Sequence, residues 1–163
     1  MTTVFRASRR PAGFDPLDAS GSVGRNGWRY NDSETPILYA AAVQSLSILE
    51  VVARPGWETV NELVVFPVKV PEGSVRTLAD LGIVLPTNWN NRPAAPSARR
   101  VGREFLTAVD AARAAGEDVC GVRVPSVIST TDFNVLLDPR QADRYVVGDP
   151  ARIPFDWLFE TGT

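Results

Sequence analysis

The sequence predicts one α+β domain, and three observations lead to that fold class. The chain has 163 residues, 44% of them apolar and 22% charged, which suits a globular domain that buries a core without disulfides. Short runs with strand character are mixed with two longer segments of helical periodicity. Neither an internal repeat nor a linker divides the chain. We therefore expect a single domain over residues 1–163, with short mixed or antiparallel sheets and flanking helices.

The first third of the chain predicts two short strands and one helix. Strands are expected at Thr3–Arg6 and Pro36–Tyr39, and residues 7–36 have the glycine and proline content that is typical of loops. A helix is then expected from Ala42 to Arg54. The stripe that should face the core holds three apolar residues and, unusually, a carboxylate: Val43, Leu46, Leu49 and Glu50.

The remainder of the chain predicts three strands and two helices. The run Asn61–Val70 is rich in β-branched residues, and Pro67 within it marks a bulge or an edge position. Thr77–Gly82 begins with a capping threonine and ends in glycine, which predicts a short helix. A longer amphipathic helix is expected over Ser97–Ala115. Two buried strands complete the domain: Gly121–Ile128 and Asn134–Leu137.

The composition excludes several kinds of chemistry. The chain has no histidine, which rules out Ser-His-Asp and Cys-His nucleophiles, imidazole bases and His-ligated metals. Lys69 is the only lysine, which argues against a P-loop or a Schiff base. Scattered aspartates predict no metal site, and a net charge of −2 argues against direct nucleic-acid binding. With one cysteine, Cys120, and neither a secretory leader nor a long apolar run, we expect a cytoplasmic protein without membrane contact.

Arg29, Tyr39 and Glu50 stand out as candidates for chemistry. An inward-facing glutamate must be paired, hydrogen-bonded or neutral, because an isolated buried carboxylate is too costly, and Arg29 is the candidate partner. Residue types alone leave two interpretations open. In one, Arg29 and Glu50 form a buried ion pair beside a core aromatic. In the other, the three side chains share a cleft and act on a ligand.

A series of short motifs extends along nearly the whole chain, from Phe5 to Asp156-Trp157-Leu158. The motifs are Phe5-Arg6, Trp28-Arg29-Tyr30-Asn31, Pro36-Ile37-Leu38-Tyr39, Leu49-Glu50, Val124-Pro125-Ser126 and Asn134-Val135-Leu136-Leu137-Asp138-Pro139, with Trp89 before the long helix. In this order and spacing they resemble the RES domain family. The chain departs from the family pattern at Trp28, where glycine is usual, and at Tyr30, where tryptophan is common.

The resemblance implies a fold similar to the diphtheria-toxin type of ADP-ribosyltransferase and a role as the toxin of a bacterial toxin–antitoxin pair. It implies that NAD is the substrate and that no cofactor is bound. The nicotinamide–ribose bond would be cleaved by inorganic phosphate as a co-substrate or by water. Two alternatives remain: transfer of ADP-ribose to a protein on the same fold, and a non-catalytic interaction module in which Arg29 and Glu50 merely pair.

The motifs also imply site residues and partners. Glu50, Arg29 and Tyr39 match the catalytic positions, and Arg6, Arg29, Tyr39, Ser126 and Asn134 match positions that bind substrate. Glu50 would stabilise an oxocarbenium-like ribosyl group, Arg29 would bind the pyrophosphate or the acceptor phosphate, and Tyr39 would stack on nicotinamide. The expected protein partner is an Xre-type helix-turn-helix antitoxin, and a homodimer is left open.

Overall fold

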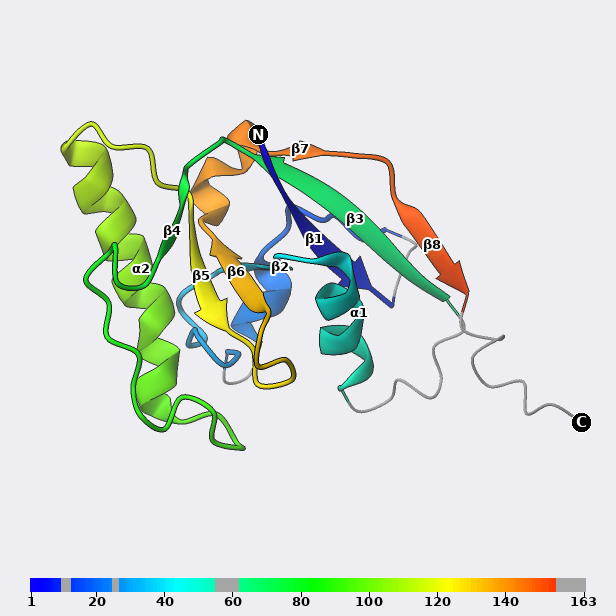
Figure 1. Ribbon diagram of the computed structural model, residues 1–163, viewed down its shortest axis with the longest axis horizontal. Coiled ribbons are helices and arrows are strands. Elements are labelled where there is room, and N and C mark those ends of the chain that lie inside the picture. Colours follow the sequence, from blue (N-terminus) through cyan, green and yellow to red (C-terminus); the bar gives the residue numbers. More distant parts are fainter. Residues whose placement is uncertain (10–12, 25–26, 55–61, 155–163) are drawn as a thin grey trace, which may run out of the picture.

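The computed structural model describes residues 1–9, 13–24, 27–54 and 62–154, and within these ranges it contains one sheet of eight strands (Figure 1). The strands pair in the order β4-β5-β6-β2-β1-β3-β7, and β8 also pairs with β3. All pairings are antiparallel except that of β4 with β5. The predicted α+β class with a mixed sheet is confirmed. The strands are β1 (Thr2–Ser8), β2 (Leu38–Ala41), β3 (Glu62–Val70), β4 (Val75–Thr77), β5 (Gly121–Pro125), β6 (Phe133–Leu137), β7 (Val146–Val147) and β8 (Ala151–Pro154).

Both longer helices that the sequence predicts are present, as α1 (Gln44–Val52) and α2 (Pro96–Ala114). Proline is well suited to the first turn of α2, where its missing N–H costs no helical hydrogen bond. The described ranges also hold two short 3₁₀ helices, η1 (Ser20–Val23) and η3 (Pro139–Arg144). Within the described ranges, no helix has both the length and the apolar character that a bilayer crossing demands.

The strand register places α1 and α2 on the same face of the sheet. β2 presents Tyr39 and Ala41 on that face, because alternate residues of a strand point the same way. Tyr39 pairs with Leu136, which packs in the cluster beneath α2. Ala41 pairs with Phe5 of β1, and the same face of β1 continues at Ala7, which packs with α1. The two helices therefore cover opposite ends of one face, with β2 between them (Figure 1).

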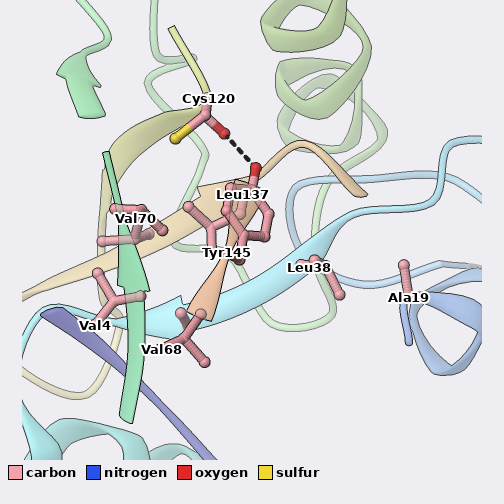
Figure 2. Packing of buried hydrophobic residues seen from close by; sticks show 10 residues of the cluster. Val4, Ala19, Leu38, Val68, Val70, Cys120, Leu137 and Tyr145 are labelled. Carbon is pink, nitrogen blue, oxygen red and sulfur yellow. Dashed lines mark hydrogen bonds between the residues drawn. The ribbon is translucent and has the colours of Figure 1, made fainter. Parts of the chain in front are cut away.

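The opposite face of the sheet carries a separate apolar core (Figure 2). Its central polar contact is made by Tyr145, whose hydroxyl donates to the backbone oxygens of Cys120 (3.2 Å) and Asp138 (2.8 Å). Burial raises the pKa of the Cys120 thiol, so this thiol behaves as a packed side chain and not as a nucleophile. The core consists of Val4, Ala19, Leu38, Ala40, Val68, Val70, Cys120, Val135, Leu137 and Tyr145.

The predicted short helix at Thr77–Gly82 is wrong. Thr77 ends β4, and residues 78–82 form turns. The capping pattern is real, since the Thr77 N–H donates to Asp80 Oδ2 (2.8 Å) and the Asp80 N–H donates to Thr77 Oγ1 (3.1 Å). Gly82, however, adopts a φ of 66°, which ends the turn before a helix can repeat.

The predicted core-facing stripe of the first helix is also corrected. Val43 and Leu49 are 37% and 44% exposed, so they do not face the core. Because α1 packs mainly on β1, its buried face is rotated from the predicted one. Glu50 lies half-buried at the border of that face. The buried residues of α1 are Leu46, Ser47 and Val51.

Pro67 lies within β3, between neighbouring strands, and not at the outer edge of the sheet. It pairs with Phe5 on one side, and on the other side its carbonyl accepts from the N–H of Gly148 (2.8 Å). In an antiparallel strand the N and O of one residue point the same way, so the missing N–H of Pro67 costs no bond to β1. Pro67 falls between the parts of β3 that pair with β7 and with β8. Neither of these short strands was predicted.

Candidate active site

A cavity of about 570 Å³ opens where β1 and β2 separate. The two strands pair at Phe5 and Ala41, and in the described structure no further pairing follows toward Ser8 and Leu38. Residues from both faces of the sheet therefore reach the cavity. Its volume lies within the roughly 300–1,000 Å³ of small-molecule sites. Five of the predicted site residues line it: Arg6, Arg29, Tyr39, Glu50 and Asn134.

Glu50 is held by two neutral donors. Its Oε1 atom accepts from Ser126 Oγ (2.9 Å) and from Asn134 Nδ2 (2.6 Å). These partners come from the end of β5 and from β6, so the sheet fixes the carboxylate of a helical residue. No hydrogen bond to Oε2 forms within the described part of the chain. Ser126 and Asn134 thus act on Glu50, leaving one carboxylate oxygen for a ligand.

Ser126 itself is fixed by the turn that follows β5. Its hydroxyl oxygen accepts from the N–H groups of Ile128 (3.0 Å) and Ser129 (3.3 Å) while its proton is donated to Glu50. This pattern is that of a serine that closes its own turn. Ser126 is 5% exposed, so it is a buried support for the carboxylate.

Arg29 does not pair with Glu50. Its Nη1 donates to the backbone oxygens of Trp89 (2.7 Å) and Asn91 (2.9 Å), and among the described residues it forms no ion pair. The ion-pair interpretation of Arg29 and Glu50 is therefore wrong. The reason is long-range: the loop before α2 supplies carbonyls that occupy one end of the guanidinium.

Tyr39 is positioned by hydrogen bonds at its hydroxyl. The hydroxyl donates to Asn31 Oδ1 (2.7 Å) and accepts from the Tyr30 N–H (3.1 Å). Burial raises the pKa of Tyr39, so the phenol stays protonated and keeps both bonds. Its ring lies 5.1 Å from that of Trp28, at an angle of 34°. The Tyr39 ring is thus already stacked on one aromatic neighbour.

Asn31 supports the site from behind the cavity lining. It belongs to one of the sequence motifs, but the motif predicted no role for it. It is fully buried, and its Nδ2 donates to the backbone oxygens of Ser22 (2.9 Å) and Thr35 (2.8 Å). The same side chain accepts from Tyr39 and from the Trp28 N–H (3.2 Å). Gly27 is needed beside it, because a Cβ there would lie 2.1 Å from the Asn31 backbone oxygen. An asparagine four residues after a glycine, in a segment typical of turns, was the available signal.

Arg6 reaches the cavity from β1. Its Nη1 donates to the Pro16 backbone oxygen and, at 3.5 Å, to that of Asp18. Its guanidinium carbon also lies 5.6 Å from the centroid of the Phe14 ring. Burial lowers the pKa of Arg6 to about 10, which leaves it charged at neutral pH.

Arg54 also lines the cavity, and none of the motifs includes it. Its guanidinium carbon lies 3.7 Å from the centroid of the Trp28 ring, a close cation–π contact. Burial lowers the pKa of Arg54, and the nearby charge of Glu50 opposes that shift. Arg54 follows Glu50 by four residues, which on a helix places two residues on one face. That spacing was the signal from which Arg54 could have been found.

The fold and the site together define a small α+β protein with an arginine-rich cavity around one oriented carboxylate. The RES domain model matches residues 3–157, and the chain belongs to the RES domain family. The resemblance seen in the sequence motifs is thereby confirmed.

Curated relatives agree with this assignment. The chain is 29% identical over 115 residues to "Toxin Res" of Yersinia enterocolitica, covering 70% of this chain and 69% of that protein. It is 28% identical over 166 residues to "Prs ADP-ribosylating toxin" of a Sphingobium species, covering 98% and 96% of the two chains. It is 27% identical over 118 residues to "Toxin Res" of Photorhabdus laumondii, covering 72% of this chain and 69% of that one.

Proposed function

We propose that this protein is the toxin of a toxin–antitoxin pair and that it consumes NAD by cleaving the nicotinamide–ribose bond, by phosphorolysis or hydrolysis. The observation that carries the proposal is the orientation of Glu50. One of its oxygens is held by Ser126 and Asn134, and the carboxylate lines a cavity that also holds arginines. The toxin names of three relatives support the biological role.

The proposed chemistry needs no histidine. When the bond between the ribose C1 and the nicotinamide nitrogen breaks, its electron pair neutralises the pyridinium charge, so no acid is needed to expel the leaving group. The ribosyl group becomes oxocarbenium-like, and a fixed carboxylate stabilises that positive charge. A phosphate oxygen then bonds to C1 to give the ribosyl phosphate, or water bonds there and releases a proton. In this proposal, Oε2 of Glu50 stabilises the positive charge of the ribosyl group.

The other site residues support Glu50 or the substrate in this proposal. Ser126 and Asn134 are positioning residues, since both donate to Glu50. Arg29 ties the loop at Trp89 to the cavity and directs its remaining N–H groups toward an anionic ligand. Tyr39 shapes the ring-binding wall together with its aromatic neighbour.

A second candidate activity is transfer of ADP-ribose to a protein. The Sphingobium relative, named as an ADP-ribosylating toxin, aligns with 98% of this chain. The two activities share the carboxylate and the ribosyl cation and differ only in the nucleophile that enters. We also propose an antitoxin as the natural partner, of the Xre-type helix-turn-helix class; a homodimer remains an alternative assembly.

The test is incubation of the antitoxin-free protein with NAD, with and without inorganic phosphate, while nicotinamide and the ribosyl product are followed by mass. Release that depends on phosphate identifies a phosphorylase, and release without phosphate identifies a hydrolase. Absence of release from a folded sample, followed by transfer of label from NAD to proteins of a cell extract, identifies the transferase. Absence of all three reactions overturns the proposal.

A further inference from the structure

Two arginines from distant parts of the chain line the same cavity. Arg6 lies on β1, whereas Arg54 follows α1, one helical turn beyond Glu50. Burial lowers the pKa of Arg6, the charges of Asp15 and Asp18 oppose that shift, and the charge of Arg54 adds to it, so the two cations are close enough to repel one another. Like charges held together in a half-buried cavity are costly unless an anion joins them.

Neither arginine meets a carboxylate at ion-pair distance within the described residues. Arg6 donates to backbone oxygens and lies over Phe14. The carboxylates of Asp15 and Asp18 accept from neutral donors of their own loop and act on Arg6 only through their charge, without an ion pair. Within the described residues no direct ion pair neutralises Arg6 or Arg54, so both can attract an anionic ligand.

The contact with Trp28 positions Arg54 for binding to an anionic ligand. The guanidinium carbon of Arg54 lies 3.7 Å from the centroid of the Trp28 ring, and its N–H groups form no hydrogen bond within the described chain. Stacking uses the face of a guanidinium and leaves the donors on its edge free for an anion. Trp28 is itself fixed, since its indole N–H donates to the Gly21 backbone oxygen (3.1 Å). This tryptophan stands where the family usually has glycine, so the support is a feature of this chain.

We propose that Arg54, oriented by Trp28, and Arg6 form a binding site for a diphosphate group. A diphosphate offers oxygens on two linked phosphorus atoms and at least two negative charges, which matches two arginines that line one cavity. The inference rests on the proposed function and assigns the pyrophosphate of the dinucleotide to this pair. It further expects a preference for NAD over nicotinamide mononucleotide, which carries a single phosphate.

The test measures binding by calorimetry of two probes that contain a diphosphate but no nicotinamide bond, ADP-ribose and inorganic pyrophosphate. Arg54→Gln should weaken both by roughly 10- to 100-fold, as expected for the loss of charge-assisted hydrogen bonds. Arg54→Lys, which keeps the charge but loses the planar fork, should fall between wild type and Arg54→Gln. The matched control is Arg100→Gln, an exposed arginine of α2 that pairs with Glu104 and lies outside the cavity.

The role of Trp28 is tested with a double-mutant cycle. Trp28→Leu should weaken ADP-ribose binding by about 3- to 10-fold in the wild-type background and should have little further effect when Arg54 is already glutamine. Equal and additive effects in both backgrounds would show that Trp28 acts without Arg54. Thermal unfolding of each variant confirms that a folded protein is compared.

The proposed site and the proposed function fail in different ways. Affinity for both probes that is unchanged in Arg54→Gln and Arg54→Lys, or absence of binding to folded wild type, overturns the diphosphate site even if NAD is cleaved. Conversely, binding that depends on Arg54 together with no reaction of NAD supports the site and overturns the catalytic proposal. For an active enzyme, the expected signature is a KM for NAD that rises in Arg54→Gln while kcat changes little.

Discussion

Arg140 and Arg54 have opposite surroundings, although both extend from the ends of regular elements next to the sheet. Arg140 donates to Asp138 Oδ1 through Nε (2.9 Å) and forms a second ion pair with Asp110 (3.0 Å). Arg54 lies on an aromatic ring and, within the described chain, meets no carboxylate. The same contrast separates the carboxylates: Asp138 is fully buried and bound by a guanidinium, whereas Glu50 is held by a hydroxyl and an amide.

The two arginines belong to regions that differ in charge pairing. We call the ion pairs of η3 the paired region and compare them with the cavity around Glu50 and Arg54. In η3, Arg140 pairs with Asp138 and Asp110, and Arg144 makes a two-oxygen contact with Asp118 (2.8 Å for each oxygen). At the cavity, Glu50 is held by neutral donors and Arg54 lies on an aromatic ring, and among the described residues neither forms an ion pair. Removal of a charge should therefore lower stability in the first region and lower function in the second.

The largest expected effect is that of Glu50→Gln on activity. The glutamine keeps the volume and can still accept from Ser126 and Asn134, but it removes the negative charge assigned to the ribosyl cation. We expect the rate of NAD cleavage to fall by about 10²- to 10³-fold or more, the range seen when a fixed electrostatic contact to a transition state is lost. The melting temperature should stay within a few degrees. A variant that turns over NAD at the wild-type rate would contradict the role of Glu50.

The corresponding removal of a charge from the paired region is Asp138→Ala. It leaves Arg140 without its buried partner and also removes the acceptor for the Gln141 amide (3.2 Å). We expect a loss of about 2–3 kcal/mol in the free energy of unfolding, which for a chain of this size lowers the melting temperature by roughly 5–10 °C. At a temperature where the variant is folded, kcat for NAD should match that of the wild type. An unfolding curve that matches the wild type would show that the ion pair of Asp138 does not stabilise the fold.

The sequence predicted the framework of this molecule well, because strong local patterns determine it. Apolar periodicity located α1 and α2 to within about two residues. The expected helix at Thr77–Gly82 failed because its cap and stop signals enclose only one turn. The strands β7 and β8 were missed because they are two and four residues long and are stabilised by pairing with β3, a long-range interaction.

The candidate site was predicted by residue type but not by partner. The motifs pointed to residues that the fold does bring to one cavity, yet they could not show that Arg29 binds carbonyls near Trp89, 60 residues away. Nor could they show that Ser126 and Asn134 converge on one oxygen of Glu50, since that contact depends on how α1 lies over the sheet. Hydrogen-bond partners are chosen in three dimensions, and residue order alone leaves several possible donors for each acceptor.

A moderate effect is expected from the two residues that hold Glu50. Ser126→Ala and Asn134→Ala each remove one donor to Oε1, and each should lower kcat by about 5- to 10-fold, the equivalent of one hydrogen bond. Because both act through the carboxylate, neither should lower the residual activity further when Glu50 is already glutamine. Losses that persist in the Glu50→Gln background would show instead that these side chains touch the substrate.

The smallest expected effect is the response of the paired region to acid. Hydrogen bonds from Arg140 and Gln141 lower the pKa of Asp138 in the folded protein against the opposing effect of burial. The folded pKa lies below the unfolded value of 3.8, so the ionised carboxylate contributes stability above that pH and loses it as the pH falls through the folded pKa. Urea unfolding between about pH 5 and about pH 2.5 should show a steeper loss for wild type than for Asp138→Asn, which cannot titrate there. The effect is smaller than that of Asp138→Ala because a protonated carboxyl still fills its site. Parallel curves for the two proteins would mean that the ion pair with Arg140 contributes nothing to stability in acid. The paired region and the cavity would then differ in which groups contact their charges, but not in how those contacts affect stability.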